Sequence, residues 1–409
     1  MLKKNLRTIL LGTVALLLIY LYFLSAEPIK SIKPINKISL IDNQKEERDA
    51  LHYLNKLRQG AGLIPLSLTK ELNRATKNHA NYLIENFTYG HYEEHNRSGF
   101  TGAFASQRVM YEGYNTELII ENVSSNNRNY KESIDGLFAA IYHRFAFLDF
   151  QGDEIGIAIK QHRFDGTKTA FVYNIGSSAL NQLYKKKKRP SEKELIKALD
   201  SYKNINNSVV TYPFDKQSDV PPVFFNELPD PLPNHEVSGF PISISFNQAH
   251  FKKIKLLKFE LFNNQGEIIS NTLVYDHKTD PNKRLNPLSF VLFPLERLEW
   301  NQKYSLNFLA VVDKKLIEKR WSFRTRSHTI PLHKVVDEDK TITVKVNIPN
   351  LFYFPPQTPK DLLKNIRYSP NFNMEFVDQN TLKLTALKSS FTTTHLKLGK
   401  QQLNLKIQN

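Results

Sequence analysis

The stretch SIDGLFAAIYHRFAFLDFQGDEIGIAIK, residues 133–160, contains the pattern that decides the fold. Its first part predicts a helix around Tyr130–His143. Its last part, EIGIAIK, is an apolar run, and a second run, TAFVYNIG at 169–176, follows the turn FDGTK. Two such runs around a glycine-containing turn predict a β-hairpin. Helices followed by a hairpin indicate an α+β unit that ends near Gly176.

Two further helices are predicted upstream of this hairpin. The first begins at Glu46 and stops at Gly60. In the second, Ala75, His79 and Leu83 recur at four-residue intervals, as on one face of a helix. We therefore expect His79 to pack on this helix rather than to bind a metal.

Composition limits the chemistry that the chain can perform. The 409 residues suffice for two or three domains, and 41% of them are hydrophobic, enough for packed cores. The absence of cysteine excludes thiol catalysis, disulfides and cysteine-ligated zinc. The net charge is +16, but the only dense basic run is YKKKKRP at 184–190. Without a nucleic-acid-binding motif, we predict no nucleic-acid partner; attraction to an anionic membrane or cell wall stays open.

The N-terminus predicts export. Three basic residues within the first seven precede a nearly unbroken apolar run, Thr8–Ala26, which is long enough to span a bilayer. Residues 1–26 are therefore either a signal anchor or a signal peptide cleaved after Ala26. Residues 27–45, rich in lysine and interrupted by proline, read as a tether. We expect an extracytoplasmic protein, in the periplasm or at the cell surface, that contacts the membrane through this helix or is secreted.

From Tyr212 onward the chain changes to short alternating runs separated by turn residues, which predicts a β-sandwich. In ISISF, residues 242–246, the isoleucines and the phenylalanine are expected to face one side and Ser243 and Ser245 the other. The region 212–328 resembles a bacterial immunoglobulin-like domain, with its Pro-Asp entry and closing WSFRT strand. Residues 329–409 are again strand-like.

Seven short features in the first part of the chain follow one another in a fixed order. They are GHYE (90–93), GFTG (99–102), Arg108, Gly-Tyr (113–114), Glu-Asn (121–122), His-Arg (143–144) and Ile-Gly (155–156). In this order they resemble the CAP superfamily (cysteine-rich secretory proteins, antigen 5, pathogenesis-related 1), and within it the cysteine-free bacterial branch. The resemblance covers residues 46–176 and implies an α-β-α sandwich with a central cleft.

The predicted fold class is therefore α+β: a CAP-like α-β-α sandwich followed by β-sandwich modules. The predicted divisions are the anchor or signal peptide (1–26), the tether (27–45), the CAP-like domain (46–180), a basic linker with a short helix (181–211), the immunoglobulin-like sandwich (212–328), and a small β module or sandwich extension (329–409).

The resemblance carries the family's cleft residues to His91, Glu121 and His143. His95 is a rival for the first histidine. The family often has a second acid about one helical turn before the final histidine, where this chain has Ala139 or Ala140.

Other polar residues near these positions are given supporting roles. Arg108 is expected to brace the loop through a carboxylate or backbone carbonyls, and Asn122 to fix the strand of Glu121. Glu93 and Glu94 are expected to be solvated. The predicted binding residues are thus Glu121, Arg108, Asn122 and His95.

Two neutral imidazoles can share a divalent metal, with zinc as the foremost candidate, and His91 and His143 are the predicted ligands. Shared coordination requires the two rings to lie within about 7 Å of each other. Glu121 could be a third ligand, orient a ligand, or act as a general base. Two function classes follow. The chain either binds a cell-envelope lipid, wall fragment, peptide or protein in this cleft, or is a metal-dependent hydrolase; whether it is an enzyme stays open.

Overall fold

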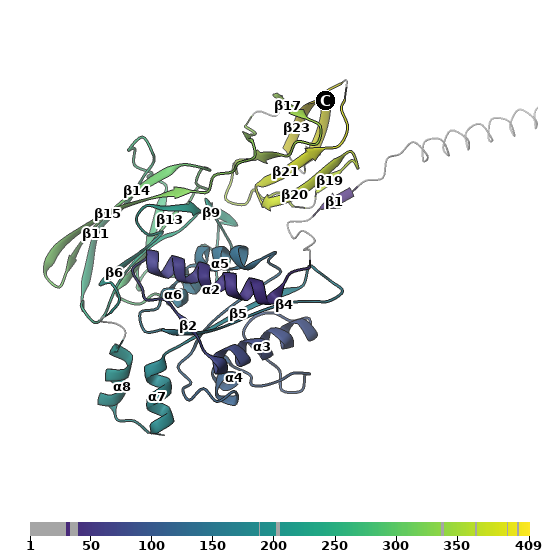
Figure 1. Cartoon of the computed structure of the whole chain (residues 1–409). Coiled ribbons are helices and arrows are strands. Elements are labelled where there is room, and N and C mark those ends of the chain that lie inside the picture. Colours follow the sequence, from purple (N-terminus) through teal and green to yellow (C-terminus); the bar gives the residue numbers. More distant parts are fainter. Residues whose placement is uncertain are drawn as a thin grey trace, which may run out of the picture. The chain divides into compact units, whose positions relative to one another are not determined.

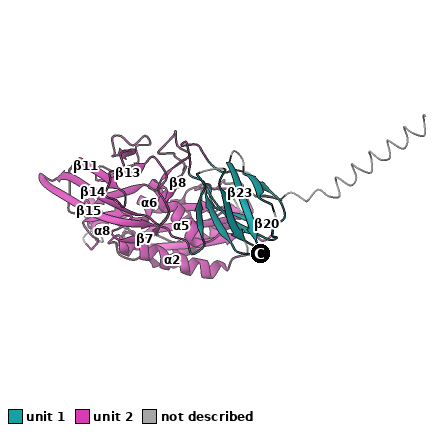
Figure 2. Ribbon diagram, turned by 90° about the horizontal axis from the view of Figure 1, so that it is seen from above, with its two compact units in different colours: residues 1–36, 329–355, 362–409 teal, residues 37–328, 356–361 magenta. Residues whose placement is uncertain are grey.

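The computed structural model describes residues 30–32, 40–187, 189–201, 205–336, 339–364, 366–390, 392–398 and 401–409. These form two compact units, coloured separately in Figure 2. Unit 2 comprises residues 37–328 with 356–361, and unit 1 comprises 1–36, 329–355 and 362–409. The apolar run Thr8–Ala26 lies outside the described residues. Among the helices that the structure does describe, none has the length and apolar character to cross a bilayer.

The N-terminal part of unit 2 is built on one four-stranded sheet in the order β2-β4-β5-β3. Three of these strands, β2, β4 and β5, are labelled in Figure 1. Its strands are β2 (Ser67–Leu68), β3 (Ile120–Ser125), β4 (Glu154–Gln161) and β5 (Thr169–Gly176). Its helices are α2 (Asn43–Gly60), α3 (Lys70–Glu85), α4 (Ala105–Tyr111), α5 (Tyr130–Ala139) and α6 (Ile141–Phe147). The predicted hairpin is confirmed, because β4 and β5 pair antiparallel from Glu154 opposite Gly176 to Gln161 opposite Thr169.

The two faces of this sheet bury different side chains. Large residues of β4 and β5, such as Ile157 and Tyr173, share a core with α2, α5 and α6. On the opposite face Ala158, Ala170 and Val172 pack against α3. The small side chains let α3 approach closely: a Cβ added at Gly156 would lie 2.3 Å from the backbone of Leu72. Helices thus cover both faces of the sheet, and the predicted α-β-α sandwich is confirmed.

The helix predicted over Tyr130–His143 is wrong as a single element. The backbone of Ala140 is extended (φ −74°, ψ 110°), so α5 ends at Ala139 and α6 begins at Ile141. The new helix start is stabilised from elsewhere in the chain, because the Ile141 amide donates to Glu227 Oε1 (2.9 Å). Periodicity alone does not reveal a break whose partner lies 86 residues away.

The chain then passes through α7 (Ser178–Lys186) and α8 (Glu192–Asp200) to a β-sandwich. Ser191 and Glu194 form a capping box at the start of α8. One sheet of the sandwich has the order β12-β13-β10-β6 and the other β11-β14-β15-β7, beside a separate β8-β9 pair. Phe246 and Phe290 of the first sheet each lie 5.7 Å from Phe308 of the second, between ring centroids. The bounds are β6 (Val209–Tyr212), β7 (Gln217–Val220), β8 (Val223–Phe225), β9 (Val237–Gly239), β10 (Ile242–Phe246), β11 (Ile254–Phe262), β12 (Thr272–Tyr275), β13 (Ser289–Pro294), β14 (Lys303–Val312) and β15 (Lys315–Thr325).

Strand β10 departs from the expected alternation of buried and exposed residues, because all five of its residues are buried. Ser245 Oγ lies 3.0 Å from Ser289 Oγ of the neighbouring strand. Ser243 Oγ accepts a hydrogen bond from Arg144 Nη1 of α6 (3.2 Å). The serine face of β10 is therefore covered by the α-β-α part of the same unit rather than by solvent.

Unit 1 consists of β-strands around its own apolar core, which includes Phe352, Phe376 and Leu405. Its sheets have the orders β16-β18-β21-β20, β17-β23-β22 and β1-β19. The bounds are β1 (Lys30–Ile32), β16 (Leu332–Lys334), β17 (Thr341–Lys345), β18 (Asn350–Tyr353), β19 (Ile366–Tyr368), β20 (Phe372–Asp378), β21 (Thr381–Ala386), β22 (Thr394–Leu398) and β23 (Gln401–Gln408).

Candidate functional site

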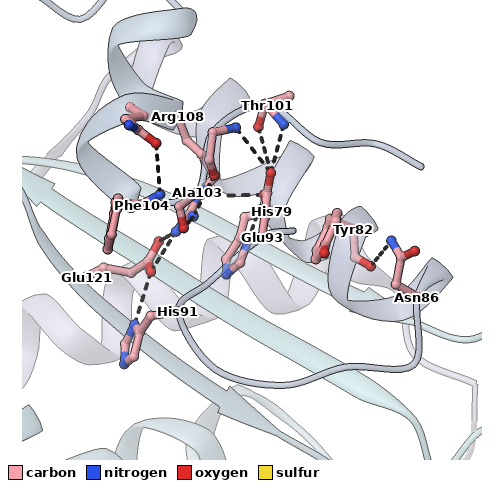
Figure 3. A network of polar contacts seen from close by, with 12 residues as sticks. His79, Tyr82, Asn86, His91, Glu93, Thr101, Ala103, Phe104, Arg108 and Glu121 are labelled. Atoms are coloured by element: carbon pink, nitrogen blue, oxygen red, sulfur yellow. Dashed lines mark hydrogen bonds and ion pairs between the residues drawn. The ribbon is translucent and has the colours of Figure 1, made fainter. Parts of the chain in front are cut away.

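Three sequence-predicted residues meet at the start of β3. His91, in the loop after α3, lies with its Nδ1 3.0 Å from Glu121 Oε1 (Figure 3). Arg108 of α4 donates from Nη2 to both oxygens of Glu121, at 2.8 Å each. The Arg108 and Glu121 side chains are buried, whereas the His91 side chain is 41% exposed. The buried Arg108–Glu121 ion pair therefore holds the Nδ1 edge of His91, and the His91 side chain also reaches the surface.

Arg108 also organises the loop that carries His91. Its Nη1 donates to the carbonyl oxygens of Gly102 (3.2 Å) and Ala103 (3.3 Å). The bracing role expected from the sequence, through a carboxylate and backbone carbonyls together, is what the structure shows. A guanidinium suits this task because its planar set of donors can serve several acceptors at once.

The second half of the site is on α6. His143 Nδ1 lies 2.9 Å from Asn122 Oδ1, and Asn122 Nδ2 donates to the His143 carbonyl (3.0 Å). Asn122 thus fixes His143, rather than only the strand of Glu121 as expected. The rings of His91 and His143 lie 6.1 Å apart between centroids at an interplanar angle of 21°, inside the predicted limit. We call His91, Arg108, Glu121, Asn122 and His143 the paired-histidine site.

A buried His79–Glu93 pair beside this site was missed. His79 Nδ1 lies 2.9 Å from Glu93 Oε1, and Glu93 Oε2 accepts hydrogen bonds from the Thr101 amide (2.8 Å) and the Gly102 amide (3.3 Å). Arg108 Nε lies 3.7 Å from Glu93 Oε1. The expectation that Glu93 is solvated is therefore wrong. Its burial follows from the loop folding back onto α3, which the polar sequence of the loop does not signal.

Asn174 of β5 is a second residue that the sequence analysis did not single out. It lies opposite Glu121 in the β3–β5 register. With its amide oriented to satisfy its neighbours, its nitrogen donates to Glu121 Oε2 (2.9 Å). A polar residue inside the apolar run TAFVYNIG was the signal that could have drawn attention to it.

The charges of the site are set by these contacts. Burial acts to raise the pKa of Glu121, but the hydrogen bond from His91 and the charge of Arg108 outweigh it and lower that pKa. The pKa of Glu93 is lowered in the same way, against the effect of burial, by His79 and the Thr101 amide. Burial, followed by the charges of His91 and Arg284, lowers the pKa of His143 to about 4. At neutral pH the two carboxylates are ionised and the His143 imidazole is neutral.

The segment that contains this site matches a known protein family. Residues 51–175 match the model of the family described as CAP, the cysteine-rich secretory protein family. This segment is a CAP domain. The expected resemblance is confirmed, and the paired-histidine site lies wholly within the CAP domain.

Solved structures with a similar fold include three bacterial proteins. An outer surface protein from Borrelia burgdorferi is 20% identical, with a TM-score of 0.30, and the match covers 34% of this chain and 96% of that one. An extracellular protein with an SCP domain from Bacillus anthracis is 14% identical (TM-score 0.29; 33% of this chain, 41% of that one). A cysteine-rich secretory protein from Staphylococcus aureus is 16% identical (TM-score 0.25; 34% and 40%). This chain thus spans about two fifths of the latter two. No curated protein matches the sequence significantly.

His95 does not join the paired-histidine site of the CAP domain. It is exposed; its Nδ1 lies 3.3 Å from Asn96 Oδ1, and its ring lies against that of Phe100. Ala139 and Ala140, where a second acid was expected, are buried at the α5–α6 junction. The second carboxylate near Arg108 comes instead from Glu93, two residues after His91.

Of the three possible zinc ligands in the CAP domain, His91, His143 and Glu121, only the two histidines have a nitrogen left for a metal. The hydrogen bonds at both Nδ1 atoms leave Nε2 of His91 and of His143 for a ligand, as is usual for metal-binding histidines. Both oxygens of Glu121, however, are engaged by Arg108. Within the described ranges no group of three or more His, Asp or Glu residues is arranged to hold a metal. A three-ligand zinc site therefore does not fit, and Glu121, buried with a lowered pKa, is a poor general base.

Proposed function

We propose that this chain is an exported protein whose CAP domain binds a cell-envelope ligand at the paired-histidine site. The observation that carries the proposal is the pairing of His91 and His143, 6.1 Å apart, each held at Nδ1. Two imidazoles fixed in this way offer one hydrogen-bonding edge each to the same bound molecule. The apolar N-terminal run supports an extracytoplasmic site of action, as do the names of two similar bacterial proteins, an outer surface protein and an extracellular protein.

Binding is favoured over hydrolysis by the state of the carboxylates. An efficient general base needs a pKa near the working pH and access to the substrate. Glu121 and Glu93 are instead buried and ionised, and both oxygens of each carboxylate already accept hydrogen bonds. Their arrangement supports a rigid platform behind the two histidines.

The test uses the full chain in detergent and isolated peptidoglycan sacculi as the probe, with vesicles of total envelope lipid as a parallel probe. We expect His91→Ala and His143→Ala each to reduce co-sedimentation at least fivefold with one of the two probes. His95→Ala, which removes an exposed histidine of the same loop, should behave as the unaltered chain. Circular dichroism shows that each variant is folded. Equal sedimentation of all three variants with both probes would refute the proposal.

A further inference from the structure

Helix α6, which carries His143, is held from two sides: by the CAP domain, for example through the bond from Arg144 Nε to the Phe138 carbonyl (2.6 Å), and by residues that follow the CAP domain in the chain. The Ile141 amide donates to Glu227 Oε1 (2.9 Å), and the Tyr142 hydroxyl donates to Asp280 Oδ1 (2.5 Å). Arg144 donates to Ser243 Oγ, and its guanidinium lies 5.1 Å from the ring of Tyr212 and 4.8 Å from that of Phe240. The residues on both sides of His143 are therefore bonded to the β-sandwich.

The loop 276–285, between β12 and β13, provides the contact with Tyr142. It is organised by Asp280, which is fully buried. Asp280 Oδ2 accepts hydrogen bonds from the amides of Arg284 (2.7 Å) and Leu285 (2.9 Å), and Oδ1 accepts one from the Asn282 amide (3.0 Å). Asn282 Nδ2 also donates to the Tyr142 hydroxyl (3.0 Å). The loop is thus fixed internally and attached to α6 by one tyrosine.

This loop places a cation against Tyr142, the residue that precedes His143 on α6. The Arg284 guanidinium lies 5.7 Å from the ring centroid of Tyr142, the residue next to His143. The charge of Arg284 acts to lower the pKa of His143, after the larger effects of burial and of His91. Arg284 is exposed and forms no salt bridge with the residues that the structure describes.

The acidic groups around Arg284 leave its charge largely available. Asp280 is committed to backbone amides and to Tyr142. Burial raises the pKa of Glu227 to about 8, so that carboxyl is mostly protonated at neutral pH. A solvent-accessible guanidinium without a carboxylate partner is a typical donor to phosphate or carboxylate oxygens.

We infer that loop 276–285 of the β-sandwich is part of the CAP-domain binding site, and that the ligand bound there presents an anionic group to Arg284. This inference rests on the proposed function and names the charge of its ligand. It assigns the β-sandwich a direct role: the sandwich helps to hold α6 and supplies Arg284 as a specificity-determining residue.

The experiment measures histidine Cε1–H signals of the full chain in detergent by NMR, at constant ionic strength because exposed charges are screened by salt. Inorganic phosphate is the anionic probe and N-acetylglucosamine the neutral probe. The His91 and His143 signals are assigned from His91→Gln and His143→Gln. We expect phosphate to shift the His143 signal saturably, and Arg284→Gln to raise the apparent Kd at least threefold. Arg320→Gln, which removes an equal charge from the exposed surface of β15, should change it less than 1.5-fold.

Two results would overturn the inference. The first is equal weakening of phosphate binding by Arg284→Gln and Arg320→Gln, which would reduce the effect to net charge. The second is a saturable shift with N-acetylglucosamine and none with phosphate, which would leave the proposed function standing without an anionic ligand. Absence of any shift with either probe, together with histidine-independent sedimentation, would contradict both proposals.

Discussion

The two histidines of the site are supported by different parts of unit 2. His91 is positioned by a buried network made within the CAP domain, in which Arg108 joins Glu121, Glu93 and the loop carbonyls. His143 shares one bond pair with Asn122 of the CAP domain, but the helix that carries it is fastened to Glu227, Ser243 and Asp280 of the following region.

This difference shows that residues outside the segment matching the family also hold part of the site in place. Residues 51–175 contain every member of the paired-histidine site and part of the support of α6, but they lack Glu227, Ser243 and Asp280, which also bond to α6. The CAP domain and the sandwich also share one continuous hydrophobic core and the Arg326–Asp135 ion pair (2.5 Å). We call His91 with Arg108, Glu121 and Glu93 the His91 half of the site, and His143 with the rest of α6 the His143 half. We expect substitutions in the His91 half to act within the CAP domain, and substitutions in the sandwich to act on the His143 half.

The largest effect is expected from Arg108→Ala, which breaks the His91 half. It leaves the buried Glu121 and Glu93 carboxylates without their cation, and loss of one partner of a buried ion pair typically costs about 3–5 kcal/mol. Urea denaturation followed by circular dichroism measures the loss. The control is Arg97→Ala, whose salt bridge with Glu94 is exposed and should contribute less than about 1 kcal/mol. Similar costs for the two variants would show that the Arg108 network is not the main support of this half.

The halves should also respond to acid in different pH ranges. The pKa of His143 is lowered from 6.5 to about 4, so the unfolded chain binds more protons in this range and the free energy of unfolding falls as the pH falls from 6.5 to 4. The slope for one proton is at most about 1.4 kcal/mol per pH unit. Glu121 and Glu93 have lowered pKa values, so their stabilising contribution is lost only below about pH 4.5.

A substitution of His143 should separate the pH range in which His143 titrates from the lower range of the two carboxylates. His143→Gln should flatten the dependence of unfolding free energy on pH between 6.5 and 4 while keeping the fall at lower pH, as measured by urea titrations at fixed pH values. His95→Gln, at an exposed histidine, serves as the control and should retain both phases. A profile for His143→Gln identical to that of the unaltered chain would contradict the burial of a neutral imidazole at this position.

The smallest effect is expected from Tyr142→Phe, which tests whether His143 can be perturbed separately from His91. The variant keeps the ring but removes the hydroxyl that contacts Asp280 and Asn282, at a cost of about 1–2 kcal/mol. Because Tyr142 connects α6 to the sandwich, the NMR signal of His143 should move more than that of His91. Tyr92→Phe, at an exposed tyrosine next to His91, is the matched control. Equal movement of both histidine signals in Tyr142→Phe would show that the halves are not independently supported.

Sequence patterns were sufficient where the structure depends on local periodicity. The β4–β5 hairpin was predicted because its two apolar runs and the turn between them lie next to each other in the sequence. The order of short motifs led to His91, Glu121 and His143 before any geometry was known. The structure then brings these three together with Arg108 and Asn122.

What the sequence did not predict depends on contacts between distant residues. The break at Ala140 depends on Glu227, and the burial of Ser243 depends on Arg144. Glu93 and Glu94 are adjacent acids with identical local signals, yet the first is buried against His79 and the second is exposed. Only the path of the folded loop distinguishes them.

The Arg108 network has a consequence for the environment in which the protein can work. The loop that carries His91 is tied down by charged and hydrogen-bonding groups in a chain that contains no cysteine. Reductants such as dithiothreitol and oxidants that act on thiols therefore have no bond to attack there. The geometry around His91 therefore does not depend on the formation of a disulfide.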